Sequence, residues 1–274
     1  MDEISKYWRV YQGALMPKTA PHLPPRSEQL SRWYLLKNGI LFARWEDNFD
    51  CGYETEWYHV IKDDKLDITK LNSNRRYKIT KGRKNFYTKV IDPKEYAESI
   101  FRVAQEAYKT YPLKYRPRIK KGDFIANIKE RTNIFIGCFD IKTDVLCGYA
   151  DINCYQDYIN YTTHKVIPAE EKRQVNAALV CGVLEYFEQN NKYKYIDDGA
   201  RNIVHETGFQ DYLKIYFGFR KAYSHLHVMY NPLIWCFVYC LYPIKQIIKK
   251  FDKISLFAKV SSVLEQERIR RSFK

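Results

Sequence analysis

Short apolar runs separated by polar turns fill the chain between Trp33 and about Val90. The runs WYLL, ILFARW and EWYHVI are rich in aromatic and branched residues, a composition typical of strands. Asn38-Gly39, between the first two runs, predicts a two-residue hairpin turn. Further strand-like runs follow at 134–139, 145–155, 193–197 and 222–230. A polar turn joins the first two of these, which predicts an antiparallel hairpin of central strands.

Apolar residues that recur every three or four positions mark the expected helices. Asp92 and Pro93 open one of them, because aspartate caps a helix and proline fits its first position. Pro112 ends it, and Pro168 precedes a second amphipathic segment. The expected helices are 92–111, 168–189 and 209–217. Strands and helices in this order predict an α/β (α+β) fold, with a mixed, mostly antiparallel sheet flanked by helices.

The two ends of the chain differ from the part between them. Residues 1–32 are polar and rich in proline, which predicts an extended arm laid over a domain, without helix or strand. Residues 233–242, LIWCFVYCLY, are ten apolar residues followed by a proline and several lysines. The expected organisation is an arm over 1–32, a domain over 33–231 and a tail over 232–274.

The apolar tail segment has two interpretations. Ten residues fall well below the roughly 18 to 20 that span a bilayer. An apolar segment with tryptophan and tyrosine followed by lysines is typical of an interfacial anchor facing anionic lipid. The alternative is a core helix or strand capped by a surface helix. The sequence leaves both open.

The composition of the chain bears on its expected binding partners and its cellular compartment. The chain has 46 Lys+Arg and 32 Asp+Glu, a net charge of +14, which favours acidic partners such as nucleic acid, anionic lipid or nucleotide cofactors. The 7 cysteines show no C-x-x-C spacing and predict reduced thiols. The N-terminus has no export signal. We therefore expect a cytoplasmic protein, peripheral on the inner face of the cell membrane if the tail is an anchor.

Several familiar site motifs are absent. The sequence has no G-x-S-x-G, Walker A or H-E-x-x-H motif, which disfavours triad hydrolases, P-loop enzymes and zincins. His225 and His227 lie two apart on one face of an expected strand, a spacing that can place two imidazoles on one metal. A third ligand is not evident, so core or partly exposed histidines are the preferred interpretation. No metal is expected.

The stretch 197–221, DDGARNIVHETGFQDYLKIYFGFRK, has the composition of a cleft floor. Thr207 and Gln210 have the spacing of a capping box, so a helix should begin just after Thr207. Its positive end then lies beside His205 and Glu206, where an anion or a developing oxyanion could be held. We expect Glu206 or His205 to act as a base, with a local hydrogen-bonding or surface role as the alternative.

Four charged residues around this helix complete the expected site. Asp197 and Asp198 end the preceding strand, and Asp198 joins the catalytic candidates. Asp197, Arg201 and Arg220 are expected to shape the acceptor site. The alternative is that each arginine pairs with one of the two aspartates for structural reasons.

A basic run from Asn74 to Lys84 could bind phosphates. Arg76 and Lys78 are its candidates for contact with a cofactor, a lipid-linked carrier or tRNA. An ordinary solvated basic strand or helix is the alternative.

Three stretches together resemble the FemAB-like branch of the GNAT acyltransferase superfamily, of the bacterial envelope or capsular polysaccharide type. They are LNSNRRYKITKGRKN, the hairpin and helix over 134–189, and ARNIVHETGFQDYLKIYFGFRKAY. The last is the most specific, and the resemblance spans roughly 33–231. It implies a GNAT-like sheet that splays between its fourth and fifth strands, here about 147–155 and 193–198. It also implies that the acyl donor enters this splay.

The same resemblance assigns the donor site. Donor phosphates would lie near the start of the helix after Pro168, a region that reads KRQVNAAL where the family has Q/R-x-x-G-x-G/A. Lys214 stands where the family often has a proton-donating tyrosine. The implied donor contacts are Val166, Ile167, Lys172, Arg173 and Gln174.

The resemblance implies an acyltransferase of cell-envelope biogenesis. The donor would be acyl-CoA, acetyl-CoA first, and the acceptor an amine or hydroxyl of a small-molecule or lipid-linked sugar precursor. One alternative is Fem-type transfer from aminoacyl-tRNA. Another is a non-catalytic module that binds RNA or anionic lipid through its basic charge and tyrosines.

Overall fold

The computed structural model describes residues 3–11, 13–113, 116–203, 208–252 and 254–273. The chain divides into two compact units. The first unit comprises Met1–Val60, Ala200–Asp211 and Arg220–Lys274, and the second unit comprises Ile61–Gly199 and Tyr212–Phe219. Each is considered by itself.

The second unit contains a five-stranded sheet. Its strands are β5 (Phe86–Ile91), β6 (Ile134–Asp140), β7 (Leu146–Cys154), β8 (Tyr158–Val166) and β9 (Tyr195–Ala200). Their order is β9-β8-β7-β6-β5, antiparallel throughout except for the parallel pair β8 and β9. The expected hairpin over 134–155 is confirmed as β6 and β7. The sequence pattern did not predict β8, because its mixture of threonine, histidine and lysine with aromatics resembles a loop.

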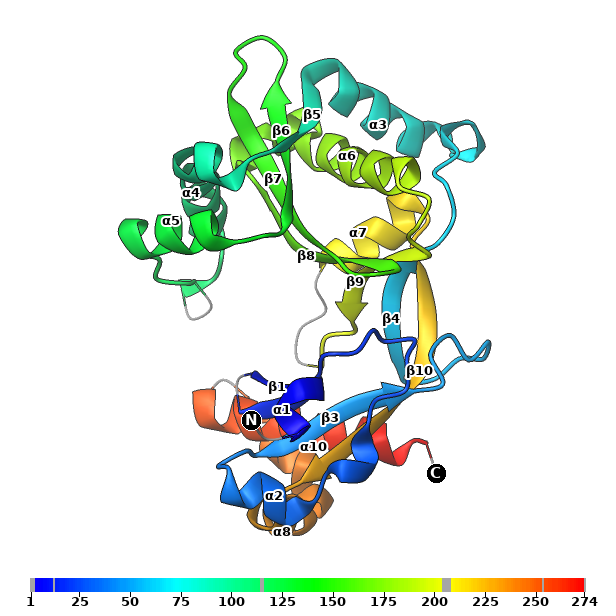
Figure 1. Cartoon of the computed structure of the whole chain (residues 1–274), viewed down its shortest axis with the longest axis vertical. Coiled ribbons are helices and arrows are strands. Elements are labelled where there is room, and N and C mark those ends of the chain that lie inside the picture. Colours follow the sequence, from blue (N-terminus) through cyan, green and yellow to red (C-terminus); the bar gives the residue numbers. More distant parts are fainter. Residues whose placement is uncertain (1–2, 12, 114–115, 204–207, 253, 274) are drawn as a thin grey trace. The chain divides into compact units, whose positions relative to one another are not determined.

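Helices cover both faces of this sheet (Figure 1). One face carries α4 (Pro93–Lys109) and α5 (Lys121–Glu130), and the other carries α3 (Ser73–Asn85) and α6 (Val175–Gln189). Asp92 caps α4 by accepting a hydrogen bond from the backbone of Lys94, as expected. The basic run is helical, in α3. The segment after Pro168 begins as a 3₁₀ helix, η4 (Pro168–Arg173), and becomes α-helical only at α6.

The first unit contains a second sheet, in the order β1-β2-β3-β10-β4. Its strands are β1 (Trp8–Tyr11), β2 (Ala14–Pro17), β3 (Phe42–Asp47), β10 (Arg220–Tyr230) and β4 (Trp57–Lys62). β3 pairs antiparallel with β10 and parallel with β2. The helices are α1 (Glu3–Tyr7), α2 (Arg32–Lys37), α8 (Pro232–Leu241), α9 (Lys245–Lys249) and α10 (Ser255–Arg271). Both units therefore have mixed, mostly antiparallel sheets with flanking helices.

The described residues also include short 3₁₀ turns and one further helix. The turns are η1 (Ser27–Gln29), η2 (Ile68–Lys70) and η5 (Tyr242–Ile244). The helix is α7 (Gly208–Phe217), which agrees with the expected helix over 209–217, and Gly218 at φ +70° ends it. No helix among the described residues is both long and apolar enough to cross a membrane.

Two sequence predictions near the N-terminus are wrong. Residues 3–11 and 13–17 form a helix and two antiparallel strands instead of an extended arm, because Trp8, Leu15 and Leu30 are buried together in an apolar cluster. Asn38-Gly39 does not join two strands. It ends helix α2, with Gly39 at φ +66°, so the same dipeptide serves as a helix stop.

Candidate functional site

The candidate active site of the second unit lies where β8 and β9 part. The two strands pair at Tyr158 with Tyr195, Ile159 with Ile196, and Asn160 with Asp197, and their register ends there. β8 continues to Val166 with β7 as its partner on the other side. The sequence predicts the splay between strands at 147–155 and 193–198. The second of these strands is β9, as expected. The first is β8 and not β7, because β7 is paired along its length between β6 and β8.

A bulge in β8 brings two polar side chains onto one face. Opposite Asp151 and Ile152 of β7 stand Thr163 and Tyr161, so Thr162 is an extra residue. Its hydroxyl donates to the backbone oxygen of Asp151 at 2.6 Å. Without a bulge, Tyr161 and His164 would point to opposite faces.

Tyr161, His164 and Asn176 form a hydrogen-bonded chain. The Tyr161 hydroxyl lies 2.6 Å from Nδ1 of His164, and Nε2 lies 2.8 Å from Oδ1 of Asn176. Burial lowers the pKa of His164 to about 4, so its ring is neutral at pH 7. Since the amide oxygen only accepts, Nε2 donates to Asn176 and the Tyr161 hydroxyl donates to Nδ1. The chain links the parted half of β8 to the first turn of α6.

The start of α6 has no side-chain cap. Gln174, the residue before the helix, has a left-handed conformation at φ +70° and no side-chain cap. The N–H groups of the first turn carry the positive end of the helix dipole, which favours phosphate. Gly82 of α3 packs closely against this turn, since a Cβ there would lie 2.8 Å from the Gln174 oxygen.

Two aspartates end the paired part of β9. Asp197 is buried, and its carboxylate accepts a hydrogen bond from the backbone of Gly199 at 2.7 Å. Asp198 is partly exposed. Burial raises the pKa of Tyr161 well above its usual value, and the negative charge of Asp198 adds to that rise. The structure therefore brings Asp198 near the hydrogen-bonded chain, which the sequence did not foresee.

Comparisons with known proteins bear on this arrangement. No protein-family model matches the sequence, and no curated protein matches it. Solved structures of similar fold include L-PGS from Bacillus licheniformis, with 10% identity over 82% of this chain and 80% of that chain and a TM-score of 0.53. A tandem GNAT protein from the clavulanic acid biosynthesis pathway has 11% identity, covers 80% of this chain and 75% of its own, and has a TM-score of 0.43.

A third structure is the PaiA N-acetyltransferase from Thermoplasma acidophilum in complex with coenzyme A. It shares 15% identity over 38% of this chain and 72% of its own, with a TM-score of 0.31. At such identities a likeness concerns the fold alone. The likeness in fold is to L-PGS. Membership of the GNAT superfamily and of its FemAB-like branch stays a prediction.

The predicted donor residues, all in the second unit, have different surroundings. Val166 is buried and Ile167 packs against the core beside α4. Arg173 forms ion pairs with Asp140 at 2.5 Å and Glu170 at 2.7 Å, contacts that fix η4 in place. Lys172 is exposed, and Gln174 precedes α6. Lys172 and Gln174 are therefore the predicted residues best placed for a ligand at the start of α6.

The predicted acceptor residues are divided between the units. Arg201 donates to the backbone oxygen of Glu56 at 2.7 Å, and Arg220 forms a two-pronged ion pair with Asp50. Both contacts lie in the first unit. In the second unit, Lys78 lies 4.0 Å over the ring of Tyr216, while Arg76 is exposed on α3. The predicted base candidates His205 and Glu206 lie outside the described residues. Thr207, the first residue of the expected capping box, also lies outside them.

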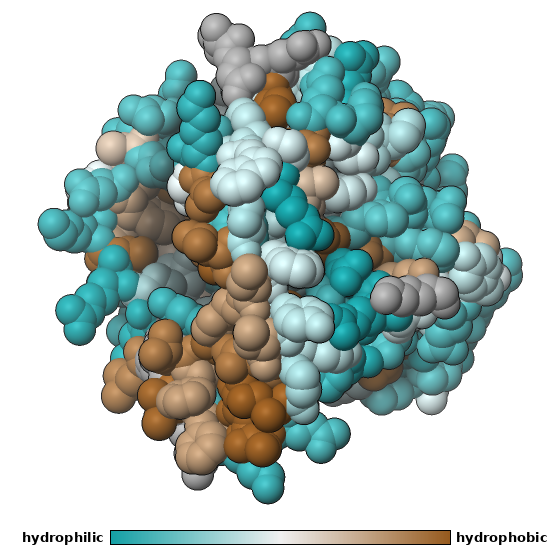
Figure 2. Space-filling model, turned by 90° about the horizontal axis from the view of Figure 1, so that it is seen from below, coloured by the Kyte–Doolittle hydropathy of each residue, from teal (hydrophilic) through white to brown (hydrophobic). Residues whose placement is uncertain are grey.

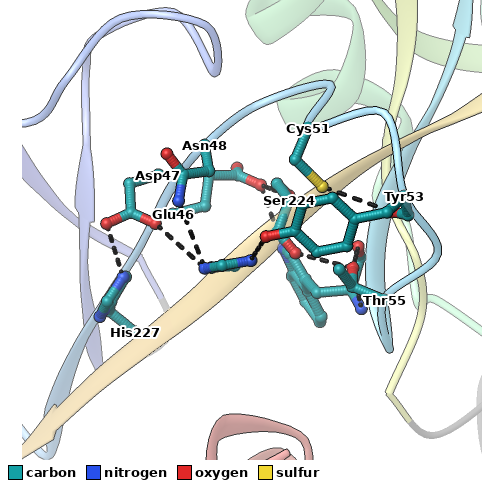
Figure 3. A network of polar contacts seen from close by, with 10 residues as sticks. Glu46, Asp47, Asn48, Cys51, Tyr53, Thr55, Ser224 and His227 are labelled. Carbon is teal, nitrogen blue, oxygen red and sulfur yellow. Dashed lines mark hydrogen bonds and ion pairs between the residues drawn. The ribbon is translucent and has the colours of Figure 1, made fainter. Parts of the chain in front are cut away.

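A second polar cluster lies in the first unit (Figure 3). The Tyr53 hydroxyl is 2.6 Å from Nε2 of His225, and the ring of Phe273 stacks on that imidazole. These residues line a hollow of about 590 Å³ together with Glu54, Thr55, Glu56 and Ser272. A phenol and an imidazole in contact can pass a proton to a group in such a hollow.

This cluster changes the interpretation of the histidine pair on β10. His227 forms an ion pair with Asp47 at 2.9 Å, and Asp47 lies 3.9 Å from His225. Among the described residues, no group of three or more His, Cys, Asp or Glu could hold a metal ion. The spacing that suggested a metal pair instead places His225 against Tyr53, a partner 172 positions away that strand periodicity cannot reveal.

Proposed function

We propose that the second unit transfers an acyl group from acyl-CoA to an amine or hydroxyl. The observation that carries this proposal is the parting of the parallel strands β8 and β9 directly ahead of the uncapped start of α6. We expect an extended ligand to lie along β8 and β9 beyond the end of their pairing. The helix start favours phosphates at the end of that gap.

The residues present fit such a donor. Lys172 and the first-turn N–H groups of α6 would hold its phosphates, and the parted edges of β8 and β9 would hold its extended arm. When bound, acyl-CoA supplies a thioester that a nucleophile can attack. The transfer needs a base that takes the proton from the acceptor, and the catalytic candidates proposed from the sequence are Glu206, His205 and Asp198. Tyr161, His164 and Asn176 link β8 to the start of α6 by hydrogen bonds.

The acceptor we propose is a small-molecule or lipid-linked sugar precursor of the cell envelope. The resemblance of the segments 71–85 and 200–223 to envelope-polysaccharide transferases supports it. A second candidate is aminoacyl transfer from tRNA, which the likeness in fold to L-PGS and the basic surface of α3 favour.

A charge placed at the start of α6 tests the donor site. Asn176→Asp keeps an oxygen acceptor for His164 but adds a negative charge in the first turn, which repels phosphate. We expect the affinity for acetyl-CoA, measured by calorimetry, to fall by about tenfold or more. The melting temperature without ligand should change little, because an acidic residue suits a helix start.

Asn191→Asp is the matched control, because this exposed residue lies beyond the other end of α6. It should bind acyl-CoA like the native protein. Hydrogen exchange should also show protection of 166–176 when the donor is bound. If neither acyl-CoA nor aminoacyl-tRNA shifts the melting temperature or protects this segment, the transferase proposal is wrong and the non-catalytic module is favoured. If a donor does bind, single-turnover assays with labelled acyl-CoA and labelled aminoacyl-tRNA distinguish the two donor classes.

A further inference from the structure

Helix α8 of the first unit has apolar side chains on nearly all sides. Its inner stripe, Ile234, Val238 and Leu241, packs into an apolar cluster with β10 and α10. Its outer side chains are also apolar but lie in solvent, with Leu233 68% and Tyr239 65% exposed. A surface helix of a soluble domain normally has a polar outer face. The outer face of α8 therefore needs an apolar partner.

The exposed apolar surface continues beyond α8. Ile244, Ile247, Phe251 and Leu256 are exposed in the segments that follow, and Ile247 is 56% exposed. Figure 2 looks onto the face that carries α2 and α8 and shows hydrophobic side chains gathered into one broad patch. We call this patch the apolar face. A contiguous apolar surface of this kind marks an interaction site.

Basic residues border the apolar face. The sequence from 232 to 244 contains no charge, whereas Lys245, Lys249 and Lys250 follow it immediately. Lys245 and Lys249 line a hollow of about 230 Å³ between α9 and α10. On the adjoining helix α2, the guanidinium of Arg32 lies 5.0 Å from the centre of the Trp235 ring.

We propose that the apolar face docks onto the surface of an anionic lipid bilayer. Tryptophan and tyrosine favour the level of the headgroups, and lysines beside an apolar helix face attract anionic lipid. A ten-residue helix is too short to cross the bilayer, so α8 lies along its surface. Charge complementarity distinguishes a bilayer from an apolar protein partner, since the charged border of the face is basic. The proposal goes beyond the acyl-transfer reaction and does not depend on it.

Vesicle flotation tests the proposal. The full chain should float with vesicles of phosphatidylcholine and phosphatidylglycerol, and much less with phosphatidylcholine alone. Replacing Leu233, Phe237 and Tyr239 together by serine should weaken binding by about tenfold or more, because each loses buried apolar area at the membrane. The matched control replaces Val90, Leu113 and Ile141, exposed apolar residues of the second unit, by serine. That variant should float like the native protein.

The basic border has its own test. Lys245→Gln with Lys249→Gln should reduce binding to phosphatidylglycerol vesicles and weaken its dependence on salt, while leaving acetyl-CoA affinity unchanged. The proposal is overturned if the native chain does not float, or if the triple serine variant floats as well as the native chain. It is also overturned if the native chain is a dimer that the triple variant dissociates while neither binds vesicles, since a second copy would then cover the apolar face.

Discussion

His164 has hydrogen-bond partners that its local sequence does not reveal. It is partly buried between Tyr161 and Asn176 and lies beside the start of α6. Neutral histidine can donate from one ring nitrogen and accept at the other, and both roles are used here. The same burial that keeps the ring neutral makes the second unit sensitive to acid.

Acidification should destabilise the second unit through His164. Its folded pKa of about 4 is below the unfolded value of 6.5, so the unfolded chain binds more protons between these values. The free energy of unfolding should therefore fall by about 3 kcal/mol as the pH drops from 7 to 4. His164→Gln should lack this part of the pH dependence, as measured by urea denaturation at several pH values. A variant with the native pH dependence would contradict the assignment.

Glu46 of the first unit has the opposite kind of shift. Its buried carboxylate accepts hydrogen bonds from Trp57 and Ser224 and lies 2.7 Å from His59. Burial by itself raises the pKa of Glu46, but the charge of His59 and these hydrogen bonds outweigh it, and the pKa lies below the usual value. A lowered folded pKa means that the stabilisation is present above the unfolded value of 4.5 and is lost as the pH falls through the folded value.

Glu46→Gln should therefore lower the free energy of unfolding by about 1–3 kcal/mol at neutral pH, because buried donors lose a charged acceptor. The difference from the native protein should shrink as the pH falls through the lowered folded pKa of Glu46, because the native carboxylate then also becomes neutral. Chemical denaturation across this pH range measures both effects. Glu98→Gln, at an exposed ion pair with Lys121, serves as the control and should change stability little.

At the scale of elements, the contact of α3 with α6 positions the candidate donor site. Gly82 lets the two helices approach, since a Cβ at this position would lie 2.8 Å from the Gln174 oxygen and 3.0 Å from the Ala178 nitrogen. Both atoms are backbone and cannot turn away. Gly82 belongs to the basic run. The run therefore has a role in helix packing, in addition to any contact of its lysines and arginines with phosphate.

Gly82→Ala should destabilise the second unit by about 1–3 kcal/mol, although alanine ordinarily favours a helix over glycine. Gly122→Ala is the matched control, because Gly122 also lies in a helix but has nothing within 4 Å of its Cβ position. It should stabilise the protein by up to about 1 kcal/mol. Thermal unfolding of both variants measures the two effects. Equal shifts of the same sign would contradict a close approach at Gly82.

At the scale of the whole molecule, the two units are interleaved in the sequence. The chain leaves the first unit after Val60, returns at Ala200, and passes through the second unit once more over 212–219. The interval 33–231 therefore contributes to both units. The hydrophobic pattern of the sequence does not show where the chain passes from one unit to the other, because each strand displays only the polarity of its own two faces.

The sequence by itself determined the elements whose cause is local. The hairpin over 134–155, the capped helix after Asp92 and the stop at Gly218 follow from residues within a few positions of each other. Such features depend on backbone preference and periodicity, which a single segment displays. The α/β class with mostly antiparallel pairing followed from their order.

Only the tertiary structure decided where the chemistry can occur. The bulge at Thr162, the chain from Tyr161 to Asn176, and the contact of Tyr53 with His225 each join residues on different elements. The splay lies between β8 and β9, one strand away from its expected position, because long-range packing determines which strands are neighbours. A side chain's partner, burial and pKa depend on atoms that the local sequence does not contain.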